Sequence, residues 1–311
     1  MMRLLFTGGG GAGNEAINRL WAGRYIMHFA DANVATISPT ISADHAHAIV
    51  CANDCRFADG LAELCLDLAI DVLIPGVDEE LPFMPRLAEL ANKTNILVPH
   101  AGYVRTMLDK LDMATILSAY GIPVPNTVLL GDAAKLDFPC IAKPRRGRGS
   151  RGFAVLQNAV AAHAYGDLFG AEDKIAQELL VGQEYTVLMA ADRNACLRAI
   201  VPVRVLNKRG ITISAVTDNN KAVIDACLAI HQAQPTEGCY NIQLMLCDDG
   251  RVMPFEINPR ISTTFCLAIA AGIDPVSLYF CVDEDKGLNQ CEAGKKLSRH
   301  WSNVISTMGE D

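Results

Sequence analysis

The chain has 311 residues, of which 50% are apolar and 20% charged, a composition that supports a buried core and excludes a disordered or fibrous protein. Its length predicts two domains or one large one. The formal net charge is −8 and the pI is about 5.4, which argues against a nucleic-acid partner, because such binders usually carry a basic face. No apolar run reaches the ~18 residues of a membrane-spanning helix, so no membrane partner is expected.

The eleven cysteines are scattered along the chain without a C-x-x-C pair. Disulfide scaffolds are shorter and denser in cysteine, so we interpret these residues as reduced thiols and expect a cytoplasmic protein. His45 and His47 could share one face of a strand, but we expect no cysteine or third histidine nearby. A metal site is therefore not expected there. The apolar run before the first glycines is too short for a signal peptide and predicts a strand.

The N-terminal third of the chain alternates predicted strands with predicted helices. Apolar runs predict strands at Arg3–Thr7, Tyr25–Ala30, Val72–Pro75 and Ile96–Val98. Helical spacing predicts helices at Asn14–Trp21, Gly60–Ala69 and Leu81–Asn92. This alternation predicts an α/β domain with a doubly wound parallel sheet, which we end near residue 102.

The remaining two thirds have an α+β pattern. Helices are predicted at Thr106–Tyr120, which Gly121-Ile-Pro-Val-Pro125 ends, and at Asn219–Gln232. Strands are predicted at Phe138–Lys143, Ile175–Glu178, Glu184–Ala190, Cys196–Val205 and Gly210–Val216. A hairpin is predicted from Tyr240–Cys247 and Arg251–Ile257 around Asp248-Asp249-Gly250.

The first motif that could carry chemistry is the glycine run 8–13, which satisfies G-x-G-x-x-G between a strand and a helix. Asp31 follows it at the end of the second predicted strand. Such a turn can hold a dinucleotide's pyrophosphate at a helix N-terminus, which would make the chain an NAD(P)-dependent oxidoreductase. A tight turn without a ligand explains the same residues.

The second motif runs from Lys143 to Gly152 and reads K-P-R-R-G-R-G-S-R-G. It follows a predicted strand, and it combines exposed backbone N–H groups with positive charge, a combination that suits a polyphosphate. It is not a Walker loop, because G-x-x-x-x-G-K-[ST] is absent. The alternative is a solvated basic turn.

The third motif places Gln243 on one strand of the predicted hairpin and E-I-N-P-R, residues 256–260, at the end of the other. Strand alternation puts Glu256, Asn258 and Arg260 on one face. Carboxylate and amide oxygens are hard ligands that suit Mg²⁺ bound together with a nucleotide's phosphates. The alternative is a polar strand end that a proline turn closes.

The second and third motifs, in this order and spacing, resemble the ATP-grasp superfamily, and in particular its carbamoyl-phosphate-synthetase-like branch with small carboxylate–amine ligases. The likeness extends over nearly the whole chain. It implies a Rossmann-like pre-ATP-grasp domain at 1–102, which needs no NAD, and an ATP-grasp domain at 103–311 whose two subdomains clamp ATP. Within the second domain it implies a flexible phosphate loop at 144–152 and an adenine hinge at 176–184.

The resemblance also assigns a metal site. Gln243, Glu256 and Asn258 match the family's ligands for Mg²⁺, with Mn²⁺ as an alternative ion. Many members carry a second acid where this chain has Gln243, so one metal ion would be held more weakly.

Lys110 and Lys143 match basic residues that reach the nucleotide's phosphates, and Arg260 matches the arginine that steadies the phosphoryl group in transfer. Lys143 and Arg260 are thus the expected catalytic residues. Further positions that match ATP-binding residues are Gly149 and Ser150 in the loop, Gln177, Glu178 and Leu179 in the hinge, Glu184 at the ribose and, in a looser alignment, Lys208.

This resemblance implies an ADP-forming carbon–nitrogen ligase that uses ATP and Mg²⁺. A substrate carboxylate would be activated as an acyl-phosphate and then attacked by an amine. The implied partners are two small molecules and, as in related proteins, a second copy of the chain. The alternatives are a regulatory nucleotide-binding protein without catalysis and, less favoured, the oxidoreductase.

Identities of the acid and the amine are not readable from the sequence. The acids 78–80 could hold an amino group or could simply favour a helix N-terminus. Arg204 and the pair Arg145–Arg146 could bind a substrate carboxylate or lie in solvent. Cys266 follows Arg260 closely, but we expect it in the core.

Overall fold

The computed structural model describes residues 1–147, 149, 151–281 and 287–301. Among them, the N-terminal sheet has the strand order β3-β2-β1-β4-β5, with every pairing parallel. Its strands are β1 (Arg3–Thr7), β2 (Ile26–Asp31), β3 (Ala46–Ala48), β4 (Val72–Ile74) and β5 (Asn95–Ile96). The intervening helices are α1 (Asn14–Leu20), α2 (Phe57–Asp67) and α3 (Met84–Leu90).

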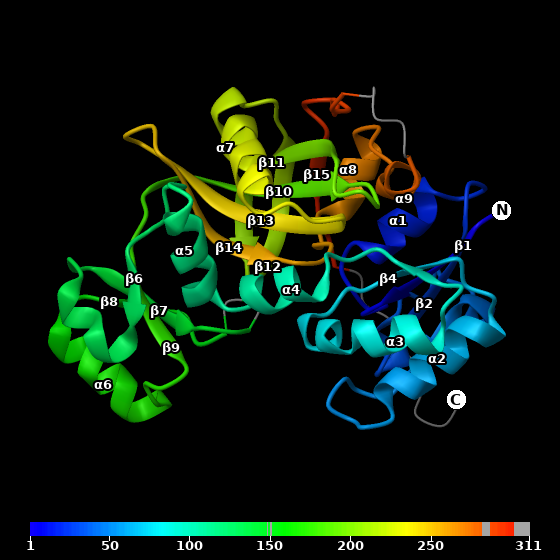
Figure 1. Ribbon diagram of the computed structural model, residues 1–311, viewed down its shortest axis with the longest axis horizontal. Coiled ribbons are helices and arrows are strands. Elements are labelled where there is room, and N and C mark those ends of the chain that lie inside the picture. The colour runs from blue at the N-terminus through cyan, green and yellow to red at the C-terminus, as the bar shows by residue number, and fades with distance from the viewer. Residues whose placement is uncertain (148, 150, 282–286, 302–311) are drawn as a thin grey trace.

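Helices cover both faces of this sheet (Figure 1). Successive side chains of a strand point to opposite faces, and those of β1 do so here. Phe6 packs in the apolar cluster that includes Ile17 of α1, whereas Leu5 packs in the cluster that includes Leu61 of α2 and Leu87 of α3. The predicted doubly wound parallel sheet is therefore confirmed.

The central sheet is antiparallel and has the order β14-β13-β10-β11-β12-β15. Its strands are β10 (Gly182–Ala191), β11 (Leu197–Arg209), β12 (Ile211–Thr217), β13 (Gly238–Cys247), β14 (Val252–Asn258) and β15 (Lys296–Ser298). The helices around it are α4 (Ala101–Met107), α5 (Lys110–Ala119), α7 (Lys221–Ala233), α8 (Phe265–Ala270) and α9 (Pro275–Tyr279). The predicted hairpin at 248–250 is confirmed as the β13–β14 turn.

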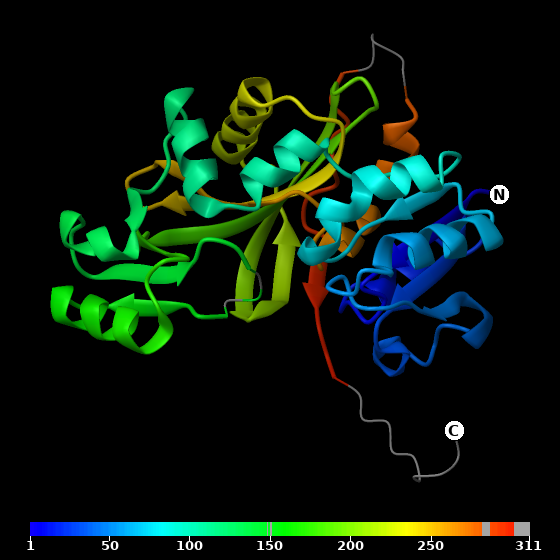
Figure 2. The ribbon, with the colours of Figure 1, turned by 60° about the horizontal axis from the view of Figure 1, so that its bottom comes forward.

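Alternation along β10 divides the core between two faces of the central sheet. Val187 packs in the cluster that includes α4, α5 and α7. Leu188 packs in the cluster that α8, α9 and the N-terminal sheet share. The N-terminal domain is thus joined to the central sheet by a continuous apolar core, and Figure 2 shows the two lying against each other.

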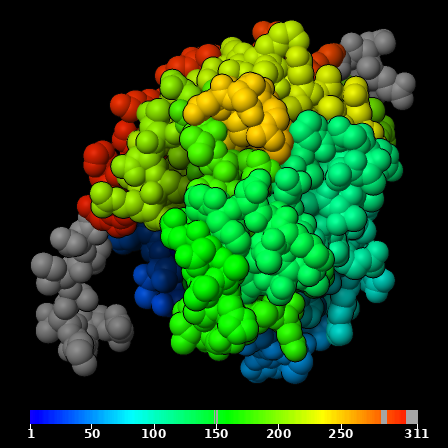
Figure 3. All heavy atoms as spheres, turned by 90° about the vertical axis from the view of Figure 1, so that its left-hand side faces the viewer, coloured from blue at the N-terminus to red at the C-terminus, as the bar shows by residue number. Residues whose placement is uncertain are grey.

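A third, smaller sheet is antiparallel with the order β6-β9-β7-β8. Its strands are β6 (Thr127–Leu129), β7 (Cys140–Pro144), β8 (Ala154–Leu156) and β9 (Lys174–Glu178). Helix α6 (Ala159–Phe169) and the 3-10 helix η4 (Leu130–Lys135) pack on it. This unit forms the end of the molecule that faces the viewer in Figure 3.

Some elements differ from the sequence prediction. The helix expected at Thr106–Tyr120 is two helices, because Asp109 has an extended backbone and its side chain caps α5. The helix expected at Leu81–Asn92 is preceded by the 3-10 helix η3 (Asp78–Phe83) and begins only at Met84. Helix α6 has no counterpart in the prediction. Among the described residues, no helix is long and apolar enough to cross a membrane.

Candidate functional site

A cavity of about 1280 Å³ lies where the three sheets meet. The described residues that line it come from the glycine turn 8–11, the acidic turn 79–80, the loop after β7, the hinge after β9 and the cavity-facing side of the central sheet. All predicted ATP and metal residues in the described part of the chain line this cavity: Lys110, Lys143, Gly149, Gln177, Glu178, Leu179, Glu184, Lys208, Gln243, Glu256, Asn258 and Arg260. Ser150 lies outside the described residues.

Two lysines lie close to Glu256. Lys143, at the end of β7, is only 7% exposed, and its Nζ donates to the Phe255 carbonyl at 3.1 Å. Lys110, at the start of α5, donates to the Gly147 carbonyl at 3.0 Å and lies 3.6 Å from Glu256 Oε1. Burial lowers the pKa of Lys143 to about 7, and the nearby charges of Lys110 and Lys208 act in the same direction against the opposing effect of Glu256. A bound anion such as a phosphate would favour the charged form.

The three predicted metal ligands come from adjacent strands. Gln243 of β13 is the direct partner of Glu256 of β14, and Asn258 lies two positions further along the same strand. These oxygen donors fit Mg²⁺, which usually keeps water and phosphate oxygens in its coordination shell instead of an all-protein cage. Within the described residues, no group of three or more His, Cys, Asp or Glu could hold a metal ion.

The hinge offers a buried acceptor. Gln177 is fully buried, and its Nε2 donates to Thr127 Oγ1 at 2.8 Å. Its Oε1 has no hydrogen-bond partner within the described residues, although buried polar atoms are nearly always paired. Glu178 is engaged differently, because its carboxylate accepts from the Asn126 N–H at 3.1 Å. A ligand that donates a hydrogen bond would satisfy Gln177.

Glu184 and Lys208 form an ion pair on the cavity wall. Lys208 Nζ lies 2.5 Å from Glu184 Oε1 and 3.2 Å from Gln243 Oε1. The lysine thus connects the predicted ribose residue to a predicted metal ligand. A nucleotide bound here would compete with Lys208 for Glu184 and with Glu184 for Lys208.

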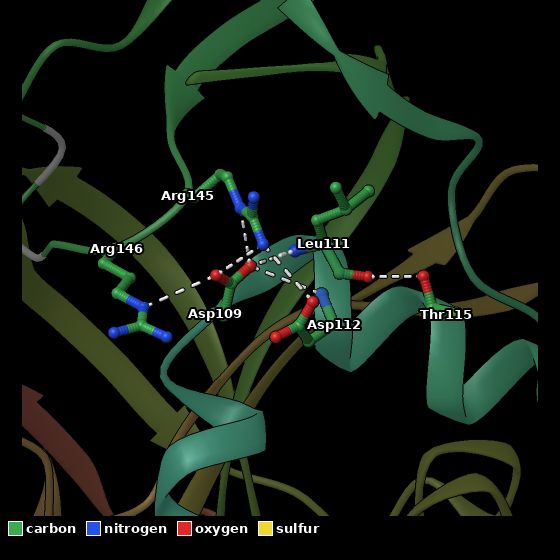
Figure 4. A network of polar contacts seen from close by, with 6 residues as sticks. All are labelled: Asp109, Leu111, Asp112, Thr115, Arg145 and Arg146. Atoms are coloured by element: carbon green, nitrogen blue, oxygen red, sulfur yellow. Dashed lines mark hydrogen bonds and ion pairs between the residues drawn. The ribbon is translucent and has the colours of Figure 1, made fainter. Parts of the chain in front are cut away.

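Asp109 connects the predicted phosphate loop to the start of α5 (Figure 4). Its carboxylate accepts from Arg145 Nε at 3.0 Å, lies 3.4 Å from Arg146 Nε, and caps the N–H groups of Leu111 and Asp112. Although burial opposes the change, the Arg145 hydrogen bond and charge lower the pKa of Asp109. Both arginines thus contact Asp109, and the side chain of Arg146 is 64% exposed. Whether they bind a substrate carboxylate or lie in solvent stays a prediction.

Arg260 is held by a residue of the N-terminal domain. Its Nε donates to Asp78 Oδ1 at 2.5 Å, and Asp78 belongs to η3 of the N-terminal domain. Both side chains are about one tenth exposed. The acidic turn thus orients the arginine that was predicted to steady a phosphoryl group, a contact between positions 182 residues apart in the chain.

The glycine turn at 8–13 is closed by its own hydrogen bonds. The N–H groups of Gly9, Gly10 and Gly11 donate to the Ala30 carbonyl, the Asp31 carboxylate and the Gly8 carbonyl at 2.9, 2.9 and 2.8 Å. Asp31 also accepts from the Asn33 N–H at 3.0 Å. A dinucleotide site requires these amides to meet phosphate and this acid to meet ribose. The geometry therefore does not support the oxidoreductase alternative.

Three histidines lie together in the N-terminal domain. His28 of β2 lies beside His45 and His47, with 2.9 Å between His28 Nδ1 and His47 Nε2. The expectation that no third histidine lies nearby is therefore wrong, because the parallel pairing of β2 with β3 brings these rings together.

Cys266 is buried as expected, and burial raises the pKa of its thiol. Arg204 lies 3.7 Å from Asp218.

Comparison with known proteins agrees with this architecture. Residues 171–299 match the family described as ATP-grasp in the biosynthetic pathway with Ter operon. The carbamoyl phosphate synthase large chain of Pseudomonas syringae pv. tomato is 28% identical over 177 residues, which are 51% of this chain and 16% of that protein. The N5-carboxyaminoimidazole ribonucleotide synthase of Synechococcus elongatus is 26% identical over 171 residues, which are 51% of this chain and 43% of that protein.

Among solved structures, the biotin carboxylase domain of the Hydrogenobacter thermophilus 2-oxoglutarate carboxylase, a dimer in complex with MgADP, ADP and bicarbonate, has a TM-score of 0.67 at 14% identity. The match covers 94% of this chain and 72% of that one. The fold is thus the ATP-grasp fold with its Rossmann-like N-terminal domain. The family model covers less than half of this chain, and the chain spans less than half the length of the two relatives named above.

Proposed function

We propose that this protein is an ADP-forming carboxylate–amine ligase that uses ATP and Mg²⁺, with Mn²⁺ as an alternative ion. The observation that carries the proposal is the set of groups on one cavity: Lys110 and Lys143 beside Glu256, with Gln243 and Asn258 at the same sheet edge. Phosphoryl transfer needs positioning and charge neutralisation more than covalent help. These residues supply both.

The metal and the triphosphate would share one end of the cavity. Gln243, Glu256 and Asn258 would hold Mg²⁺, whose charge neutralises the phosphates when it is bound. Lys110 and Lys143 would move from backbone carbonyl partners to phosphate oxygens, which are stronger acceptors. Gly149 and Ser150, in the loop 144–152, would lie over the phosphates and exclude water, which would otherwise hydrolyse an acyl-phosphate.

The rest of the nucleotide would extend along the hinge 176–184. Gln177 Oε1, which is buried without a partner among the described residues, would accept from the amino group of adenine, with Glu178 and Leu179 beside it. Glu184 would exchange Lys208 for the ribose hydroxyls, which leaves that lysine free for a phosphate. Arg260, oriented by Asp78, would steady the phosphoryl group as it moves to the carboxylate.

We further propose that residues 1–102 and 103–311 act as the two functional units and that both substrates are small molecules. The biotin carboxylase relative was described as a dimer, and we propose a homodimer here as well. The two relatives named by sequence are a carbamoyl phosphate synthase and an N5-carboxyaminoimidazole ribonucleotide synthase. These names are compatible with carbon–nitrogen bond formation as the reaction class.

The test is thermal stability with a non-hydrolysable ATP analogue and Mg²⁺ and, separately, with NADH. A ligand at 100 times its Kd stabilises by roughly 2.7 kcal/mol, enough to shift the midpoint visibly. We expect a shift with the nucleotide that EDTA and Glu256→Ala remove, and none with NADH. A screen of ADP release with bicarbonate, hydroxy acids and the common L-amino acids would follow. Binding without ADP release under any of these conditions would favour a regulatory nucleotide-binding protein.

A further inference from the structure

The N-terminal wall of the cavity carries a buried carboxylate that the phosphate and metal residues do not use. Glu80 is 4% exposed, lines the cavity, and accepts a hydrogen bond from Thr7 Oγ1. Thr7 ends β1, and its Oγ1 accepts in turn from the Gly76 N–H just after β4, at 3.1 Å. The carboxylate is thus fixed at the carboxyl ends of two adjacent parallel strands, where open α/β sheets bind ligands.

Arg260 places this carboxylate close to the site of phosphoryl transfer. Arg260 pairs with Asp78, which lies two residues before Glu80 in the same short helix. Arg260 and Glu80 both line the cavity, and the positive charge of the arginine is the smallest of the influences on the pKa of Glu80, which it lowers. An acyl-phosphate held by Arg260 would therefore have Glu80 on its N-terminal side, opposite the metal ligands.

An amine needs a base before it can attack. A primary amine with a pKa near that of lysine, about 10.4, is protonated at neutral pH and has no free electron pair. Among the described residues that line the cavity, none is a histidine or a tyrosine. The proton acceptor would therefore be one of the carboxylates or lysines that line the cavity.

Glu79 also lines the cavity, but it is exposed, whereas Glu80 is buried. Most of the other groups are engaged elsewhere. Glu256 belongs to the metal set, Glu184 pairs with Lys208, and Glu178 accepts from a backbone N–H at the hinge. Asp31 accepts from the backbone N–H groups of Gly10 and Asn33. Lys143 would be held in its charged form by phosphate, so it would not serve as the base.

We infer that Glu80 takes the proton from the ammonium group of the second substrate, an inference that rests on the proposed ligase function. The Glu80 carboxylate removes one proton from R–NH₃⁺, and the freed electron pair forms the bond to the acyl carbon. The carbon–oxygen bond to the phosphoryl group breaks, and inorganic phosphate leaves with that electron pair. The second proton on nitrogen leaves to solvent.

The surroundings of Glu80 suit this role. Burial raises its pKa to about 7, and the negative charges of Asp31 and Glu79 act in the same direction, while the Thr7 hydrogen bond and the Arg260 charge oppose them. A base with a pKa near the working pH exchanges its proton most effectively. The amine-dependent rate should therefore rise with pH through about 7.

Glu80→Gln and two nucleophiles of different charge test the inference. Hydroxylamine is uncharged at neutral pH and traps an acyl-phosphate as a hydroxamate, whereas ammonium and the L-amino acids must lose a proton first. With an L-amino acid as the acid, we expect the variant to form hydroxamate and ADP within about threefold of wild type, while amide formation falls by at least about 100-fold, the range of general-base catalysis. With bicarbonate, the corresponding products are a hydroxycarbamate and a carbamate. Glu89→Gln, the same change on the exposed side of α3, is the control.

Two different failures can be told apart. If Glu80→Gln keeps amide formation, or loses hydroxamate and amide formation equally, Glu80 is not the base. If wild-type protein forms neither ADP nor hydroxamate with any of these acids, the proposed function fails, and this inference fails with it. Binding of the Mg²⁺–ATP analogue by Glu80→Gln shows that the variant is folded. The inference would also be overturned if the amine-dependent rates of the variant and of wild type had the same pH dependence.

Discussion

Two glycine-rich turns line the same cavity, and they differ in what they can offer a ligand. In the turn at 8–13, the N–H groups of Gly9, Gly10 and Gly11 are all used within the fold. In the loop after β7, Gly147 and Gly149 lie beside Lys110 and Lys143. The presence of glycines therefore does not define a phosphate site. The second loop differs in the positive charge of Lys110, whose Nζ donates to the Gly147 carbonyl.

The reason for glycine also differs between the two turns. A Cβ on Gly10 would lie 2.2 Å from Thr36 Oγ1, so glycine is needed there for close packing. A Cβ on Gly149 would meet nothing within 4 Å, but the backbone has a φ of +71°, which L side chains rarely adopt. A side chain at Gly10 would thus collide with Thr36, whereas a side chain at Gly149 would meet no neighbour.

The largest expected effect concerns the positive charge beside the second glycine-rich turn. Lys143→Met should weaken binding of the Mg²⁺–ATP analogue by about 100-fold, or about 3 kcal/mol, because it removes a buried charge that would pair with phosphate. Isothermal titration calorimetry measures the change. Lys93→Met, on the exposed surface of the N-terminal domain, should bind like wild type. An unchanged affinity for Lys143→Met would place the phosphates elsewhere.

The next effect is on stability and concerns the N-terminal wall. Glutamate titrates near 4.3 in the unfolded chain, whereas burial raises the pKa of Glu80 to about 7 in the folded chain. The folded state therefore binds more protons in this window, and the free energy of unfolding falls as the pH rises through it. At about pH 8, Glu80→Gln should be more stable than wild type by up to about 3 kcal/mol. Urea denaturation at about pH 8 and pH 4 measures the difference, which should vanish at the lower pH.

Substituting one glycine in each turn would break or sharpen the comparison directly. Gly10→Ala should lower the free energy of unfolding by about 2 kcal/mol through overpacking against Thr36, with nucleotide affinity unchanged. Gly149→Ala should lower affinity more than stability, since its exposed loop can relax. Thermal midpoints and titrations of both variants are the measurement. A loss of affinity in Gly10→Ala at an unchanged midpoint would show that the first turn contacts the nucleotide after all.

The smallest expected effect concerns the anchor of the second turn. Asp109→Asn keeps an oxygen that can cap α5 but removes the charge that holds Arg145 and Arg146. We expect nucleotide affinity to fall by about fivefold, the effect of roughly 1 kcal/mol, with little change in stability. Asp112→Asn, at a half-exposed partner of Arg145, is the matched control. An affinity loss as large in the control would assign the effect to overall charge.

Local patterns determined much of this protein. Alternating apolar runs predicted the parallel sheet because buried strands and helices have different periods. Period-two alternation placed Glu256 and Asn258 on one face of β14, and the hairpin turn brought Gln243 opposite Glu256. Lys143 at a strand end, followed by glycines, predicted a phosphate site, which stays a prediction. Each of these relations spans a few residues or one turn, so the sequence contains the information.

Tertiary structure alone decided the rest. The pairing of Arg260 with Asp78 and the closure of the first glycine turn on Asp31 depend on which segments pack together. The approach of His28 to His45 and His47 depends on the order of strands in the sheet. The same glycines and charges are compatible with a dinucleotide site or with a closed turn. The difference lies in whether backbone donors are already paired, and contacts between distant segments determine that pairing.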